Sequence, residues 1–144
     1  MSYRRENKIS VLKSMRNVSY VEFLKAITEL QTEVFTWAKS QSPKTKELGV
    51  ITLYRYVEEA FGFAFAANCR YPSTIDDFNF RATNLLKARE NLHCFNAQLA
   101  VVNNVINIST KKLKRWCNAS ERAIRLINGV IKSDKTKAKN KNIN

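Results

Sequence analysis

The residues best placed to do chemistry are seven cations in the segment from Ser109 to Ser133. They are Lys111, Lys112, Lys114, Arg115, Arg122, Arg125 and Lys132. Glu121 is the one acid in this segment, so the positive charges are not neutralised along a helix. Such a row attracts a polyanion, although most basic helix faces do no more than contact water. The imbalance favours a binding surface for phosphate groups.

The same segment has an apolar pattern that predicts how these charges are positioned. Its members are Leu113, Trp116, Ser120, Ala123, Ile127 and Val130, at steps of three and four with one polar break at Ser120. This spacing predicts a helix about seven turns long with one apolar face. One face would pack on a protein core, and the basic face would meet an anion.

The whole chain is basic, with a net charge of +13 over 144 residues. This surplus indicates a polyanionic partner, most often nucleic acid, less often an anionic membrane or an acidic protein. Further candidates for nucleic-acid binding are Arg81, Lys87 and Arg89 in mid-chain and Arg4 and Arg5 near the N-terminus. No known nucleic-acid-binding motif is present, so we expect salt-dependent binding of the phosphate backbone with little base specificity.

The residue types that catalyse reactions or bind metal ions are present, but their spacing does not form a catalytic or metal-binding site. His93 is the only histidine, and the adjacent acids Glu58-Glu59 and Asp76-Asp77 would point about 100° apart on a helix. The chain has no phosphate-binding glycine loop and no C-x-x-C pair. We therefore expect a protein that is not an enzyme, with no catalytic residue, no metal site and no cofactor.

The cysteines and the apolar runs predict a location in the cell. Cys69, Cys94 and Cys117 are odd in number and far apart, which is typical of thiols in a reducing compartment. The N-terminus has no apolar core of a signal peptide. The longest apolar run, Ala60 to Ala67, is shorter than the roughly 20 residues that span a bilayer. We expect a cytoplasmic protein without membrane association.

Four long helices account for most of the chain. The first begins at a Ser19/Glu22 capping box and ends near Ser40, and the second begins at Ser42-Pro43. The third runs from about Thr74 to Asn104 behind a Ser73 cap, and the fourth begins at Ser109. The apolar stripe of the second helix is expected to include Leu48, Ile51, Val57, Phe61, Ala64 and Phe65.

This series of helices predicts an all-α, antiparallel up-down-up-down four-helix bundle. The bundle covers residues 18–133 as one domain. Residues 1–17 form a basic N-terminal arm that is mobile or ordered only by a partner. Residues 134–144 form a disordered Lys-rich tail, because this segment cannot bury enough apolar surface to fold alone. The fold class therefore includes flexible basic termini.

The second and third helices carry more aromatic side chains than one apolar face of each helix can hold. Phe63 would point nearly opposite Phe61 and Phe65, and Phe80 and Phe95 lie off the seam of the third helix. Two interpretations stay open. Phe63, Phe80 and Phe95 form an oligomer interface, or their helices lie centrally in their own domain.

From Tyr20 to Ser133 the chain resembles the accessory variability proteins (Avd) of diversity-generating retroelements, within a wider four-helix-bundle family that includes ribosomal S23-like proteins. The resemblance lies in an aromatic-rich first helix, the Ser42-Pro43 opening and the stretch Arg81-Ala-Thr-Asn-Leu-Leu-Lys-Ala-Arg89 after Tyr71-Pro72. The fourth helix opens at Ile108-Ser109-Thr-Lys-Lys-Leu. It ends with Gly129, Ile131 and Lys132, while Val130 stands where the family often has tryptophan.

This resemblance implies a homopentamer that binds RNA and a partner reverse transcriptase. It implies a supporting role in mutagenic cDNA synthesis, with catalysis left to the reverse transcriptase. Two other hypotheses stay open: an S23-like bundle associated with ribosomal RNA, and a scaffold or adaptor that binds an acidic protein.

Overall fold

The computed structural model describes residues 21–141, and in this part of the chain all regular structure is helical. The long helices are α3 (Glu22–Lys39), α5 (Ile51–Asn68), α6 (Ile75–Val105) and α7 (Thr110–Asn140). A short helix α4 (Pro43–Thr45) and a π-helix η1 (Lys46–Val50) precede α5. The predicted all-α class with four long helices is confirmed. The expected arm of residues 1–17, with Arg4 and Arg5, and the Ser19 cap lie outside the described residues.

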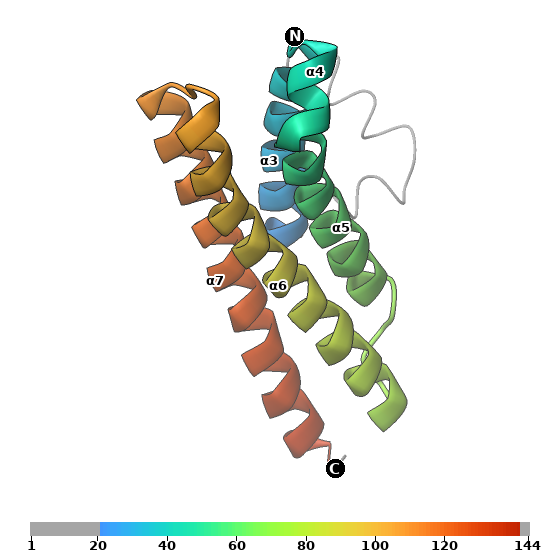
Figure 1. The fold of residues 1–144 in the computed structure, drawn as a ribbon. Coiled ribbons are helices and arrows are strands. Elements are labelled where there is room, and N and C mark those ends of the chain that lie inside the picture. Colours follow the sequence, from blue (N-terminus) through green and yellow to red (C-terminus); the bar gives the residue numbers. More distant parts are fainter. Residues whose placement is uncertain (1–20, 142–144) are drawn as a thin grey trace, which may run out of the picture.

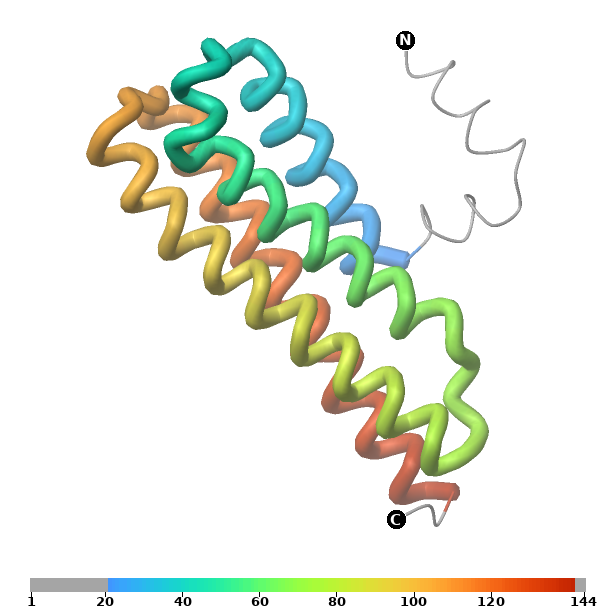
Figure 2. The backbone as a smooth tube through the Cα atoms, turned by 45° about the vertical axis from the view of Figure 1, so that its right-hand side comes forward, coloured from blue at the N-terminus to red at the C-terminus, as the bar shows by residue number. Residues whose placement is uncertain are grey.

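Each long helix packs against two others. α3 contacts α5 and α7, and α6 contacts the same two helices (Figure 1). α3 has 18 residues and α6 and α7 have 31 each. Among the described elements, therefore, α5, α6 and α7 continue past the start of α3 at one end of the molecule (Figure 2).

The core lies between these helices and is almost entirely apolar. Its largest fully buried side chains are Trp116, Phe95, Leu24, Ile27, Leu30, Leu53, Leu85, Leu92, Leu99 and Ile127. Removing such side chains from water is the main favourable term in folding. The polar break predicted at Ser120 is buried too, and its hydroxyl donates to Oδ1 of Asn96 at 2.6 Å. This pair joins α6 to α7 without leaving an unsatisfied polar group.

Side-chain caps begin the helices nearly where the sequence predicts. Ser42 Oγ accepts from the Thr45 amide at 3.3 Å, and Ser109 Oγ accepts from the Lys112 amide at 3.2 Å, as expected. The cap of α6 differs by one residue.

The α6 cap is Thr74 rather than Ser73. Thr74 Oγ1 accepts from the Asp77 amide at 3.2 Å, and Asp77 Oδ2 accepts from the Thr74 amide at 2.9 Å. Ser73 also donates its hydroxyl to Asp77. Both serine and threonine stand three residues before an aspartate, so the sequence pattern fits either residue.

The π-helix η1 changes the register of the second helical region. Gly49 has φ of +152°, a backbone conformation that residues other than glycine rarely adopt. The predicted apolar stripe is wrong at Leu48 and Ile51, which are 70% and 45% exposed. Val50 and Leu53 are buried instead. Ile51 belongs to α5 and lies about 120–180° from the buried positions of that helix at 100° per residue, so the predicted stripe has the wrong phase there.

The last helix is longer than predicted. α7 continues to Asn140, so the expectation of a disordered tail from residue 134 is wrong as far as Asn140. Asp134 is buried and pairs with Arg81 of α6 at 2.8 Å, an interaction that composition alone cannot reveal. Residues 142–144 lie outside the described part of the chain.

Candidate nucleic-acid interface

The basic residues of α7 gather on one exposed face. At about 100° per residue, Lys111, Lys114, Arg122, Arg125 and Lys132 fall within an arc of about 80°. All five are exposed. The arc lies opposite the buried positions Trp116, Ser120, Ala123 and Ile127. α7 thus presents one face to the core and another to solvent, as the two sequence patterns predict.

The continuation of α7 lengthens this face. Lys135 and Lys139 are exposed and follow Lys132 at steps of three and four, so they lie on the same side of the helix. We define the α7 stripe as Lys111, Lys114, Arg122, Arg125, Lys132, Lys135 and Lys139. From its first to its last residue the stripe spans about 42 Å at 1.5 Å per residue. Lys135 and Lys139 were missed because their segment was expected to be disordered, although their spacing is visible in the sequence.

No residue of the α7 stripe forms an ion pair with an acid in residues 21–141. Glu121 is the one acid exposed on the same side of α7. Like charges at this spacing repel one another when nothing neutralises them. An anion bound along the stripe would relieve that repulsion, so the unneutralised charges favour the binding of a polyanion.

The other two candidates on α7 lie toward its flank. Arg115 pairs with Glu33 of α3 at 2.6 Å, and both side chains are well exposed. An exposed pair of this kind contributes about 0–1 kcal/mol, so phosphate can replace Glu33 at little cost. Lys112 is partly buried beside the stripe.

Arg81 belongs to the fold. Its guanidinium donates to Asp134 through Nε at 2.8 Å and through Nη2 at 3.2 Å. Nη1 donates to the carbonyl oxygens of Ala67 and Arg70, at 3.1 and 3.0 Å, where α5 ends. The side chain is only 12% exposed. The structure therefore corrects the assignment of Arg81 to nucleic acid, because its donors are already used to join α5, α6 and α7.

The two remaining basic candidates of α6 point in different directions. Arg89 is partly buried and donates to Asn128 Oδ1 of α7 at 2.7 Å, beside the stripe. Lys87 is exposed, and its ammonium lies 5.4 Å from the centre of the Phe63 ring on α5. Arg89 is therefore adjacent to the α7 stripe, and Lys87 is separate from it.

The three aromatic interface candidates have different surroundings. Phe95 is fully buried and packs against Trp116 with ring centres 6.5 Å apart, so its assignment to an oligomer interface is wrong. Phe63 and Phe80 are partly buried, and the Arg70 guanidinium covers the Phe80 ring at 3.9 Å. For Phe63 and Phe80 the interface stays a prediction.

Other chemistry has little support in the described residues. Residues 21–141 contain no group of three histidine, cysteine or acidic side chains placed to hold a metal ion. No helix in this range combines the length and the apolar content needed to cross a membrane. Cys69, Cys94 and Cys117 are free thiols, and burial together with the nearby Glu121 raises the pKa of Cys117.

Comparison of the chain with known proteins finds no matching family model, no matching curated protein and no matching solved structure.

Proposed function

We propose that this protein is a non-catalytic RNA-binding protein whose α7 stripe binds the phosphate backbone. One observation carries the proposal: seven exposed cations follow one helix for about 42 Å and have no acidic partner in the described residues. Each bound phosphate would release counterions from the RNA, and this release is the main source of affinity in such binding.

The geometry favours contact with the outside of the RNA. A-form RNA has a major groove too deep and narrow for side chains to read, and lysines on phosphate carry no sequence information. α7 would therefore lie across the backbone or along a single strand. Binding of this kind is strongly salt-dependent and depends on RNA length more than on base sequence.

We further propose that the four helices form the antiparallel up-down-up-down bundle expected from the sequence. The pairing of α3 and α6 with α5 and α7 supports this arrangement. On the resemblance alone, the narrower proposal is a cytoplasmic homopentamer that assists a retroelement reverse transcriptase in mutagenic cDNA synthesis. An S23-like association with ribosomal RNA and a scaffold for an acidic protein are the alternatives.

A pair of charge-reversal variants tests RNA binding. The stripe variant carries Lys114→Glu, Arg122→Glu and Arg125→Glu. The control carries Lys25→Glu, Lys44→Glu and Arg55→Glu, which are also exposed, lie on other helices and give the same net charge. Affinity for a single-stranded RNA that spans the stripe, measured by fluorescence anisotropy at physiological salt, should fall about 30-fold in the stripe variant and about 3-fold in the control.

Equal losses in the two variants would mean that only net charge matters, and an unchanged affinity in the stripe variant would reduce the stripe to a solvated face. Circular dichroism should show the same helical content in both variants.

The partner proposals need separate measurements. Light scattering at micromolar concentration should show an oligomer, and a clean monomer would overturn the pentamer. A stable complex with a co-expressed reverse transcriptase from the same gene neighbourhood supports the retroelement role. Co-purification with ribosomes in its place would favour the S23-like alternative, and tight nuclease-resistant binding of an acidic protein would favour the scaffold.

A further inference from the structure

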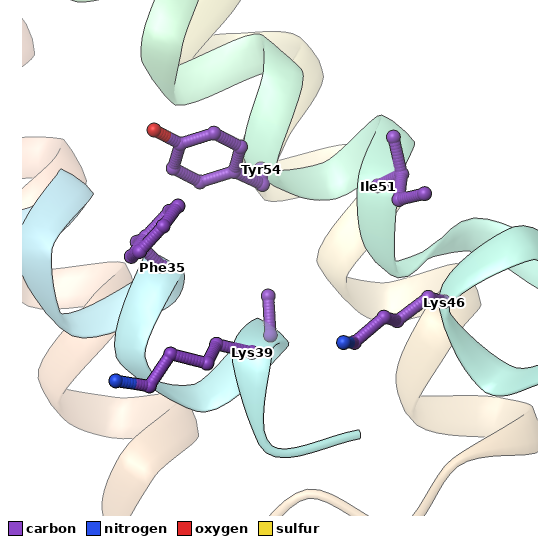
Figure 3. A pocket seen from close by; sticks show the side chains of 6 residues that line it. Phe35, Lys39, Lys46, Ile51 and Tyr54 are labelled. Carbon is purple, nitrogen blue, oxygen red and sulfur yellow. The ribbon is translucent and has the colours of Figure 1, made fainter. Parts of the chain in front are cut away.

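An apolar groove lies on a helix pair that carries none of the α7 stripe. It is a pocket of about 240 Å³ between the end of α3 and the π-helix η1 that leads into α5. Its lining residues are Phe35, Ala38, Lys39, Lys46, Ile51 and Tyr54 (Figure 3). The wall is almost entirely carbon. The proposed RNA contact does not use this groove, and of its lining residues Tyr54 also packs against the core.

Two large apolar side chains lie at the groove without being covered. Phe35 is 51% exposed and Ile51 is 45% exposed. Ile51 faces outward because, at 100° per residue, it lies about 120–180° from the buried positions of α5. Neighbouring exposed apolar groups of this kind mark contact surfaces more often than single ones do.

The groove is formed before anything binds. Phe35 and Tyr54 hold each other with ring centres 5.2 Å apart and planes tilted by 59°. The Tyr54 hydroxyl accepts from Gln31 Nε2 at 3.2 Å, which fixes the ring from its polar end. A preformed wall lowers the entropy that a ligand must lose on binding.

Two lysines give the groove its charge preference. Lys46 extends toward the groove from the side of Ile51, and Lys39 lines the Phe35 side with its ammonium directed away from the centre of the groove (Figure 3). Neither lysine pairs with an acid among residues 21–141, and no acid lines the pocket. A ligand with an apolar centre and negative flanks would match both properties.

Size and shape decide between a protein segment and a nucleobase. Drug-sized ligands occupy pockets of roughly 300–1,000 Å³, so this pocket suits one apolar side chain. A base would leave its polar edges unsatisfied against a carbon wall. The tilted rings of Phe35 and Tyr54 also offer no parallel slot for stacking. We propose that this groove docks an acidic segment of a partner protein, which inserts one aliphatic or aromatic side chain between Phe35 and Ile51 and places carboxylates on Lys39 and Lys46.

Two short peptides test the docking. The probe is acetyl-Glu-Glu-Leu-Glu-Glu-amide, and its control has serine in place of leucine. Titration into the ¹⁵N-labelled full chain should shift amide resonances around Phe35 and Ile51, with a Kd of about 0.1–1 mM for the leucine peptide and at least about 5-fold weaker binding of the serine peptide. Equal binding of the two peptides would overturn the proposal, because only charge would then be recognised.

Variants of the chain locate the peptide. Ile51→Ser should weaken the leucine peptide about 10-fold, and Lys39→Ser combined with Lys46→Ser should weaken it as much. The matched control is Lys44→Ser, an exposed lysine of the same region that does not line the pocket, and its affinity should stay within about 2-fold.

Two outcomes would overturn the proposal in favour of another site or ligand. Loss of peptide binding in the stripe variant of α7 would place the peptide on that helix. A single-stranded RNA that shifts the groove resonances, and ceases to do so in Ile51→Ser, would assign the groove to nucleic acid. Circular dichroism on every variant separates these outcomes from misfolding.

Discussion

α6 and α7 are equally long, and both carry arginines, but the arginines have different surroundings. Arg81 and Arg89 of α6 donate hydrogen bonds within the chain, to Asp134, to two carbonyl oxygens and to Asn128. Arg122 and Arg125 of α7 are exposed and have no ion-pair partner in the described residues. Both helices pack against two others, but Arg81 and Arg89 are partly buried near acceptors of neighbouring segments, whereas Arg122 and Arg125 lie on the solvent face of α7. The availability of an arginine thus depends on the acceptors around it, more than on the local density of charge.

The largest expected effect tests the structural side of this contrast. Arg81→Met should lower the free energy of unfolding by about 3 kcal/mol, because Asp134 would stay buried without its partner. Thermal unfolding followed by circular dichroism should then occur about 10 °C lower. RNA affinity at low temperature should be unchanged.

Arg89→Met is the matched control for that variant. Its hydrogen bond to Asn128 is partly exposed, so the loss in stability should stay below about 1 kcal/mol. If the two variants unfold at the same temperature, Arg81 contributes no more than Arg89 to joining the helices. If Arg81→Met loses RNA affinity while folded, the original assignment to phosphate is restored.

A second expected effect concerns Ser120, which with Asp134 is one of two buried polar residues of α7 that pair with α6. Ser120→Ala should cost about 1–2 kcal/mol, because the Asn96 side chain would lose its partner across α7. The double variant Ser120→Ala/Asn96→Leu should recover part of that loss in a urea titration, since both polar groups are then removed. Strictly additive losses would show that the two side chains are not coupled.

A smaller effect separates the two helices by salt dependence. Arg122→Gln should reduce the slope of log K against log salt by about 0.7 for single-stranded RNA, the change expected for one lost phosphate contact. Arg89→Gln should leave the slope unchanged. The measurement is RNA binding at several salt concentrations, and equal slopes in the two variants would remove the distinction between α6 and α7.

The smallest expected effect is a difference in pH dependence between the first turn of α6 and the first turn of α7. The backbone N–H of Thr74 and the Ser73 hydroxyl bind the Asp77 carboxylate and lower its pKa from 3.8 to about 2. Its contribution to stability is therefore complete above pH 3.8 and is lost as the pH falls toward 2. The cap of α7, Ser109, has no acid in its first turn.

Amide hydrogen exchange corrected for its intrinsic pH dependence should show α6 fraying from its start over this pH range and α7 unaffected. Asp77→Asn should abolish the pH dependence at α6. Parallel fraying of both helices would assign the effect to global acid unfolding.

Much of this contrast is visible in the sequence. The steps of three and four predict both faces of α7, and Ser42, Ser109 and the approximate limits of α6 follow from capping rules. Local patterns suffice for these features because each depends on residues within one or two helical turns.

Features that depend on distant contacts were not predictable. Arg81 and Asp134 are 53 residues apart, and their contact fixes both the role of Arg81 and the order of the helix beyond Ser133. The register change at Gly49 depends on a φ value that one glycine allows but does not require. The assignment of Phe95 to an interface is wrong because helix periodicity does not show how closely Trp116 of α7 approaches it.

The two tryptophans of the chain lie in one aromatic cluster, where the Trp37 and Trp116 rings meet edge to face with centres 5.4 Å apart. Tryptophan fluorescence therefore reports on the contact of α3 with α7 and does not detect changes at the opposite end of the molecule. Local opening around Arg81 would leave the emission spectrum unchanged while helical content falls. A fluorescence melt that lags behind a circular dichroism melt would thus show two separately unfolding ends, without any added label.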